Sequence, residues 1–190
     1  IEQGRLQLFC VDSVDRESWS DKEGNPRYRA EMQEKWFNYI TNEIVPFIHN
    51  YTGRKDLIVT GCSMGGTHAG ISFFRRPDLF ETLIALSGAF DASMFFGNYM
   101  DDLVYNNSPV HFLRNMPEDH YYLDIYRNKK IILCIGQGAW EEDLLPSNHE
   151  MNAILKEKNV PAWVDFWGYD VAHDWNWWQL QIRYFMDKVL

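Results

Sequence analysis

Short runs rich in β-branched and aromatic residues alternate along this chain with longer segments of helical periodicity. The runs that predict strands span residues 6–11, 57–60, 83–86, 131–135 and 162–167. Such alternation is typical of a mainly parallel sheet flanked by helices, because parallel neighbours need a crossover connection. With 190 residues, 46% of them apolar, the chain can build the core of one α/β domain over residues 1–190.

The first helical segment lies between the first two predicted strands. Apolar side chains recur there every three or four residues and predict one buried face: Met32, Trp36, Ile40, Ile44, Phe47 and Tyr51. Pro46 interrupts this pattern, so we expect it to kink the helix or to restart it from a first-turn position.

Two further helices are predicted near the end of the chain. Ser147 and Glu150 have the spacing of a capping box, which predicts a helix over 147–158. The last helix follows from apolar residues at helical spacing, including Trp175 and Trp178, with Gln181 among the residues that can face water. We expect most of these tryptophans in the core; a carbohydrate-stacking platform is the alternative.

Residues 91–127 fit neither period and are rich in Asn, Asp, Met and aromatic residues. They predict a long irregular excursion between two strands, of the kind that often forms a lid or a substrate wall. His111 and His120 fall inside it and are expected on the surface, with a lid position near the substrate as the alternative.

Charge and composition exclude several classes of protein. A formal net charge of −9 without a dense Lys/Arg cluster argues against a nucleic-acid partner, and no apolar run reaches about 18 residues, the length that spans a membrane. Cys10, Cys62 and Cys134 lie in or beside apolar runs, so we expect buried free thiols in a reducing compartment, the cytoplasm. Their spacing suggests no metal site.

The feature most informative about chemistry is the segment 57–66, in which an apolar strand runs into a G-x-S-x-G motif centred on Ser63 and then into a helix. This turn raises the serine hydroxyl at the carboxyl end of the sheet, and it predicts that Gly61 and Gly65 must lack a side chain. Ser63 is therefore the candidate nucleophile. The backbone N–H of Met64, at the start of the helix, is placed to donate to an oxyanion.

A serine nucleophile needs a base, which in folds with this elbow follows both the serine and the acid along the chain. His173 comes after the predicted strand 162–167 by a short loop and precedes the last helix, which is where such a base lies. His68 and His149 fall within predicted helices and are expected to be structural.

The acid is expected in the loop after strand 131–135. Three adjacent carboxylates compete there, and we favour Glu141, followed by Asp143 and then Glu142. Asp174 adjoins His173, but a helix N-cap is its expected role.

With these motifs the chain resembles the Putative esterase family of α/β-hydrolases, which includes esterase D-like and feruloyl-esterase-like enzymes and the mycolyltransferases. The segments that carry the resemblance are 43–48, 61–66, 77–80, 86–91 and 173–178. It implies an α/β-hydrolase fold and hydrolysis or transfer of an acyl group by Ser63, with no metal and no organic cofactor. Many members have Asp where this chain has Ala139 and Trp140, so the match for the acid shifts to Glu141 or beyond.

Family members usually carry further strands before the one predicted at 6–11, with a loop that donates the second oxyanion N–H. The resemblance therefore implies a domain that lacks its N-terminal strands in this sequence.

The leading functional hypothesis is a carboxylic-ester hydrolase acting on a small-molecule ester through an acyl-enzyme, and a homo-oligomer is possible. Acyltransferase or thioesterase activity, a peptidase, and a catalytically inactive α/β-hydrolase-like binding protein are the alternatives.

Overall fold

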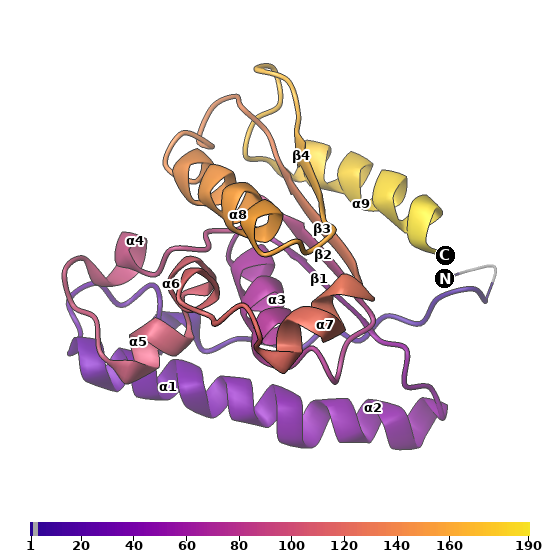
Figure 1. Ribbon diagram of the computed structural model, residues 1–190, viewed down its shortest axis with the longest axis horizontal. Coiled ribbons are helices and arrows are strands. Elements are labelled where there is room, and N and C mark those ends of the chain that lie inside the picture. Colours follow the sequence, from indigo (N-terminus) through magenta and orange to yellow (C-terminus); the bar gives the residue numbers. More distant parts are fainter. Residues whose placement is uncertain (2–3) are drawn as a thin grey trace.

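Four parallel strands form the centre of the molecule: β1 (Ile58–Cys62), β2 (Thr82–Leu86), β3 (Lys130–Ile135) and β4 (Trp163–Phe166). They lie side by side in their sequence order in this computed structural model, which describes residue 1 and residues 4–190 (Figure 1). Each strand pairs in parallel with the next. Four of the five predicted strands are thereby confirmed, each to within two residues at either end.

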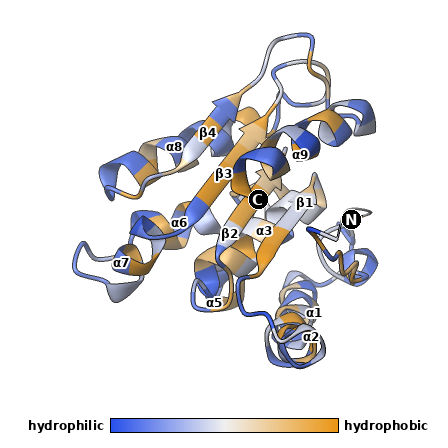
Figure 2. Cartoon of the chain, turned by 90° about the vertical axis from the view of Figure 1, so that its right-hand side faces the viewer, coloured by the Kyte–Doolittle hydropathy of each residue, from blue (hydrophilic) through white to orange (hydrophobic). Residues whose placement is uncertain are grey.

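Both faces of the sheet are covered by helices, because successive side chains of a strand point to opposite sides. Leu83 and Ala85 of β2 pack into the larger core, with α3 (Met64–Arg75) and α8 (Leu145–Glu157). Ile84 and Leu86 pack on the other side against α9 (Trp175–Val189). Figure 2 shows apolar strands β2 and β3 between more polar helices. The predicted layered α/β architecture is confirmed.

The segment before β1 is a nearly continuous helical rod of α1 (Pro26–Tyr39), a π-helical turn η2 (Ile40–Ile44) and α2 (Val45–Thr52), seen along the bottom of Figure 1. Pro46 lies in the first turn of α2, so it restarts the helix from a first-turn position, which is one of the two predicted outcomes.

The buried face of this rod differs from the prediction. The side chains of Phe37 and Val45 are buried, whereas Phe47 and Tyr51 are exposed and stack on each other. A π-helical turn holds more residues than an α-helical turn, so it rotates the faces that follow it and a pattern of period 3.6 no longer identifies the buried side.

Residues 91–127 are helical where an irregular excursion was predicted. They contain four short helices: α4 (Ser93–Phe96), α5 (Asp102–Asn106), α6 (Pro109–Arg114) and α7 (Tyr121–Arg127). Helices of four to seven residues are shorter than the window in which helical periodicity is detected, which explains the error. Val110 and Leu123 anchor α6 and α7 in the larger core.

The predicted strand at 6–11 is wrong. This segment has no regular secondary structure, although it is an almost continuous apolar run, because its backbone pairs with no strand of the described sheet. The segment and β1 both line a cavity of about 1310 Å³. Leu8 is 54% exposed, and Cys10 is exposed, which corrects the expectation of three buried thiols. Cys134 is buried and Cys62 half-buried.

Helix α8 begins two residues earlier than its predicted capping box. Pro146 occupies its first turn, and the Ser147 hydroxyl, already inside the helix, donates to the Leu144 carbonyl at 3.0 Å. The predicted cap of α9 is present, since the Asp174 carboxylate accepts from the Trp175 N–H.

The faces of α9 only partly follow the prediction. Trp178 is buried, but Trp175 is 64% exposed, and Gln181 is fully buried although it was predicted to face water. Among the described residues, no helix combines the length and the apolar character needed to cross a bilayer.

Candidate active site

Ser63 occupies the sharp turn between β1 and α3. Its φ of 54° lies in the left-handed region, which a non-glycine residue adopts only when the surrounding structure holds it there. The Ser63 N–H donates to the Leu86 carbonyl of β2 at 2.9 Å, which ties the turn to the sheet. The predicted strand, turn and helix are therefore present, with the serine hydroxyl at the carboxyl end of the strands.

Two glycines make this turn sterically possible, and they are not both the predicted ones. A Cβ at Gly61 would lie 2.2 Å from the Gly65 carbonyl oxygen, and one at Gly66 would lie 2.6 Å from the Leu86 carbonyl oxygen. At Gly65 a Cβ would meet no described atom within 4 Å. The steric demand predicted for Gly65 is wrong, since the close approach of α3 to the sheet falls one residue later.

The structure brings together the three side chains favoured by the sequence. His173 Nε2 lies 2.8 Å from Ser63 Oγ, and His173 Nδ1 lies 2.9 Å from Glu141 Oε2. The loop that carries His173 is fixed by its own backbone, because the His173 N–H donates to the Ala139 carbonyl at 2.9 Å. Ser63, His173 and Glu141 thus form one continuous line of hydrogen bonds.

Of the three competing carboxylates only Glu141 faces the imidazole. It is 1% exposed, whereas Glu142 and Asp143 are exposed. Trp140, immediately before it, has a φ of 70° and lies in the turn that directs the Glu141 side chain inward. The Trp140 indole itself is 82% exposed.

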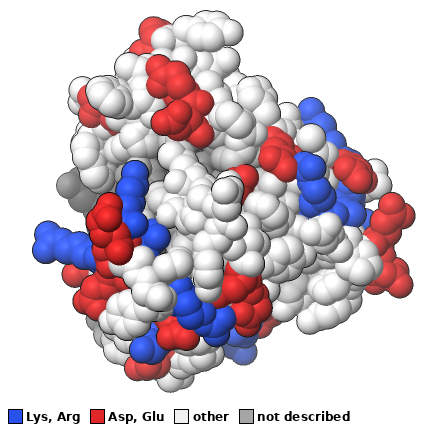
Figure 3. Space-filling model, turned by 90° about the vertical axis from the view of Figure 1, so that its left-hand side faces the viewer, with Lys and Arg blue, Asp and Glu red and all other residues white. Residues whose placement is uncertain are grey.

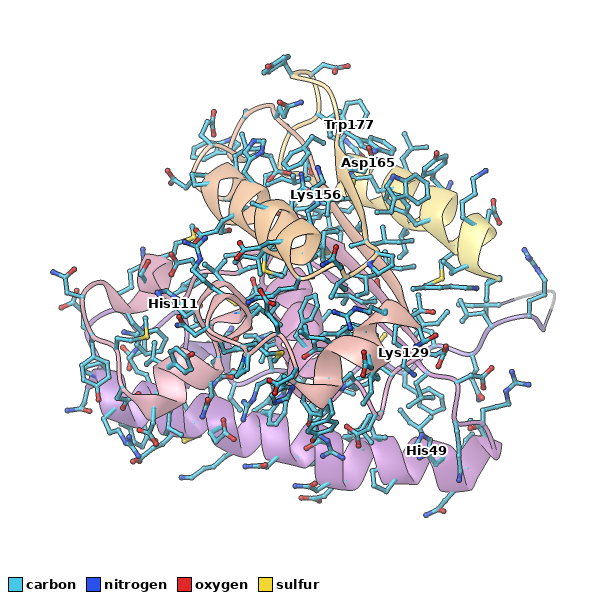
Figure 4. The ribbon with its side chains drawn as sticks, viewed as in Figure 1. His49, His111, Lys129, Lys156, Asp165 and Trp177 are labelled. Atoms are coloured by element: carbon cyan, nitrogen blue, oxygen red, sulfur yellow. The ribbon has the colours of Figure 1, made fainter. Side chains whose placement is uncertain are left out.

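The other histidines lie elsewhere. His68, on α3, is buried and contacts Asp15 at 2.8 Å, and His149 stacks on Phe166 with ring centroids 4.3 Å apart. Figure 4 shows His49 on α2 and His111 on α6, well apart from each other and from Trp177 at the start of α9. His120 accepts a hydrogen bond from the Tyr122 N–H as the N-cap of α7, which is a structural role.

Two side chains that the sequence did not indicate extend the line of hydrogen bonds. The Ser87 hydroxyl lies 2.6 Å from Glu141 Oε1, and the Trp178 indole N–H donates to Ser87 Oγ at 3.0 Å. The signal for Ser87 was its place directly after a parallel strand, where functional side chains gather. Nothing in the sequence pairs it with Trp178, 91 residues away.

A small cavity of about 190 Å³ opens beside Ser63 and His173. Its other lining residues are mostly apolar: Met64, Thr67, Ser87, Ala89, Met94, Phe95, Trp140, Asp143 and Leu144. Met64 is the first residue of α3, so its N–H is among the helix groups that have no acceptor within the helix. Figure 3 shows that the middle of the face carrying α4 and α5 is largely uncharged, with charged side chains around it.

No group of three or more His, Cys, Asp or Glu side chains is arranged to hold a metal ion in the part of the chain that the structure describes.

Comparison with solved structures identifies the fold. A ferulic acid esterase is similar with a TM-score of 0.61 and 22% identity, over 77% of this chain and 57% of its own. The fluorophosphonate-binding serine hydrolase F of Staphylococcus aureus has a TM-score of 0.61 and 20% identity, over 80% of this chain and 62% of its own. The S-formylglutathione hydrolase of Staphylococcus aureus has a TM-score of 0.61 and 20% identity, over 85% and 64%. The chain thus spans about three fifths of the length of these proteins.

The parallel sheet, the serine elbow and these neighbours define the class: the chain has the α/β-hydrolase fold. The sequence model of the Putative esterase family matches residues 8–184, so the chain belongs to that family and the resemblance is confirmed. No curated protein matches the chain closely in sequence.

Proposed function

We propose that this protein is a serine hydrolase that cleaves carboxylic esters of small molecules through an acyl-enzyme on Ser63. The observation that carries the proposal is the unbroken line of hydrogen bonds from Ser63 through His173 to the buried Glu141. Membership of the esterase family supports the same reaction class.

In the first half of the proposed reaction, Ser63 Oγ attacks the ester carbonyl carbon while His173 Nε2 takes the hydroxyl proton. The carbonyl oxygen becomes an oxyanion, and the N–H of Met64 at the start of α3 is the donor we assign to it. Glu141 stabilises the positive charge that forms on the imidazole, because its carboxylate accepts from Nδ1.

The oxyanion then collapses and the bond to the alcohol oxygen breaks. His173 gives its proton to the departing alcohol, which leaves the acyl group esterified to Ser63. A water molecule attacks this acyl-enzyme with His173 again acting as the base, and the acid product leaves with Ser63 restored to its hydroxyl form. The cycle needs only water as co-reactant.

The cavity beside Ser63 supports a preference for a small acyl group. A cavity of about 150 Å³ lined by apolar side chains is large enough for benzene, and the one here has about 190 Å³ with Met94, Phe95 and Leu144 in its lining. We therefore propose esters whose acyl part is a short aliphatic chain or a single ring.

Labelling with a fluorophosphonate probe tests the proposal, because only an activated serine attacks phosphorus readily. The adduct is located by peptide mass spectrometry in the wild-type protein, in Ser63→Ala and His173→Ala, and in His149→Ala as the matched histidine control. We expect an adduct on Ser63 in the wild type and in His149→Ala, and none on that peptide in the other two.

Hydrolysis of p-nitrophenyl esters, from acetate to octanoate, then identifies the substrate class. An adduct with faster turnover of short esters supports the proposal in full. A wild-type protein that gives neither adduct nor ester turnover would contradict it, and would favour a binding protein that retains the fold alone.

A further inference from the structure

The side of Glu141 that faces away from His173 is occupied by a second pair of residues. Ser87 is completely buried at the end of β2, and its hydroxyl lies 2.6 Å from Glu141 Oε1. Trp178 of α9 is 7% exposed and places its indole nitrogen 3.0 Å from Ser87 Oγ. Each oxygen of the Glu141 carboxylate therefore has its own side-chain partner, His173 on one and Ser87 on the other.

The chemistry of these groups fixes the direction of every hydrogen bond. An indole N–H can only donate, so Ser87 Oγ accepts from Trp178 and its own proton points to Glu141. An ionised carboxylate can only accept, so His173 donates from Nδ1. Nε2 is then left without a proton and accepts from Ser63. This is the tautomer that a general base requires.

Ser87 is held in a backbone conformation that does not suit a serine. Its φ is 49°, in the region that glycine adopts without strain, and its N–H donates to the Cys134 carbonyl of β3 at 2.7 Å. Glycine would fit this backbone better, but it would leave Glu141 Oε1 with only the Gly136 N–H, at 3.4 Å. Strain of this kind gathers at functional sites.

Trp178 also contacts the base itself. Its ring meets the His173 imidazole in a T-shaped arrangement, with centroids 4.7 Å apart and planes at 89°. The same indole therefore supports the ring of His173 directly and its carboxylate partner through Ser87.

We propose that Ser87 and Trp178 are positioning residues for the hydrolysis, which fix the carboxylate of Glu141 in the orientation that His173 needs. This inference rests on the proposed function. Both act through Glu141 and His173, which take part in the bond-making steps, so we expect their effect on kcat rather than on KM.

Steady-state kinetics on a short p-nitrophenyl ester tests the inference with Ser87→Ala, Ser87→Gly and Trp178→Phe. The two Ser87 variants both lack the hydroxyl, but only the glycine relieves the strained φ. We expect both to lower kcat on the order of 10- to 100-fold, as for loss of a hydrogen bond to a charged group, with KM within about twofold. Trp178→Phe keeps an aromatic ring, although a smaller one, and loses the N–H, so its expected loss is smaller, roughly 3- to 10-fold.

The pH profile of kcat/KM separates positioning from a structural role. Without the Ser87 hydroxyl the Glu141 carboxylate has lost a hydrogen-bond donor, so it accepts more strongly from His173 Nδ1 and makes Nε2 a poorer base in acid. We expect the acid limb of the profile to move to higher pH in the Ser87 variants, whereas a loss of stability alone would leave it in place.

Ser147→Ala and Trp19→Phe are the matched controls. Ser147 is a buried hydroxyl bonded to the Leu144 carbonyl, and Trp19 is a buried indole whose N–H donates to Gln33 at 2.8 Å. We expect both to lower the Tm while leaving kcat and the acid limb unchanged.

The inference would be overturned if the Ser87 variants fold and have wild-type kcat with an unmoved acid limb. It would also be overturned if kcat falls in proportion to the Tm in the variants and in the controls alike. If Ser87→Ala does not fold, Ser87→Gly and Trp178→Phe decide by the same criteria. An inactive wild-type protein would overturn the hydrolysis itself, and the inference with it.

Discussion

Ser63 and His173 are separated by 110 residues in the chain, yet their Oγ and Nε2 atoms lie 2.8 Å apart. Two elements produce this approach: the elbow that ends β1 and the loop that follows β4. Both lie at the carboxyl edge of one parallel sheet, and that edge is where the loops of such a sheet meet.

Glu141→Gln is predicted to be nearly inactive while remaining folded. The amide has almost the volume of the carboxylate, but its NH2 group can donate to His173 Nδ1, and the imidazole then carries its proton on Nε2 and cannot take that of Ser63. We therefore expect kcat to fall by on the order of 10⁴, as when the acid of a Ser-His-Asp triad becomes an amide. Ester hydrolysis measures kcat, and circular dichroism verifies the fold.

Glu142→Gln is the matched control for that prediction, since its carboxylate is an exposed neighbour of Glu141 and does not line the cavity beside Ser63. It should retain wild-type kcat to within about threefold. A larger loss in Glu142→Gln than in Glu141→Gln would assign the acid to Glu142.

Met94→Ala is predicted to widen the cavity beside Ser63. Met94 is 45% exposed at the cavity, and its loss leaves room for a longer acyl chain. Because each methylene placed in an apolar pocket contributes to discrimination, we expect the kcat/KM ratio of octanoate to acetate esters to rise about 5- to 10-fold. Met100→Ala, an exposed methionine outside the cavity lining, should leave the ratio unchanged. An unchanged ratio in Met94→Ala would place the acyl chain elsewhere.

The sequence was most informative where one physical rule decided the outcome. Four parallel strands followed from apolar β-branched runs, and the elbow followed from the glycines around Ser63. The proximity of Ser63, Glu141 and His173 could be expected because each lies in the turn or loop after a strand, and a parallel sheet brings those positions to one edge.

The errors arose where the outcome depended on neighbours in space. Residues 6–11 are an apolar run of the kind that forms strands, but a strand also needs a partner along its edge, and the sequence pattern does not show one. On the first helix the predicted face was already inexact, since Phe37 is buried while Trp36 is only half-buried, and the π-helical turn at 40–44 then rotates the face that follows. The Ser87–Trp178 hydrogen bond could not be predicted for a related reason. It joins the end of β2 to α9, and no local sequence pattern indicates that these two elements pack together.

Asp15→Asn is predicted to destabilise the fold at neutral pH and to have little effect in acid. Burial by itself would raise the pKa of Asp15, but its hydrogen bonds with His68 and Ser13 outweigh burial and lower that pKa below the usual value. A lowered pKa means that the ionised carboxylate stabilises the fold above about pH 3.9, the unfolded value. That contribution is lost as the pH falls through the lower, folded pKa.

Urea unfolding at pH 6.5 and at pH 3 measures this difference. We expect Asp15→Asn to lose about 1.5 kcal/mol at pH 6.5, the lower end of the range for a hydrogen bond to a charged group because the Asp15 side chain is partly exposed, and clearly less at pH 3. Asp119→Asn, at an exposed site, serves as the control. An equal loss at both pH values would mean that the Asp15 side chain acts through packing rather than through its charge.

Gln181→Met is predicted to stabilise the protein. The Gln181 side chain is fully buried between α9 and the sheet, and its amide nitrogen and oxygen have no hydrogen-bond partner among the described residues. A buried polar group without a partner costs free energy that a thioether of similar length does not, so we expect the free energy of unfolding to rise by about 1 kcal/mol. Gln179→Met, on the exposed side of the same helix, should change it by less than about 0.5 kcal/mol. Urea denaturation of both variants provides the comparison, and a lower stability of Gln181→Met would show that the buried amide has a bonding partner in solution.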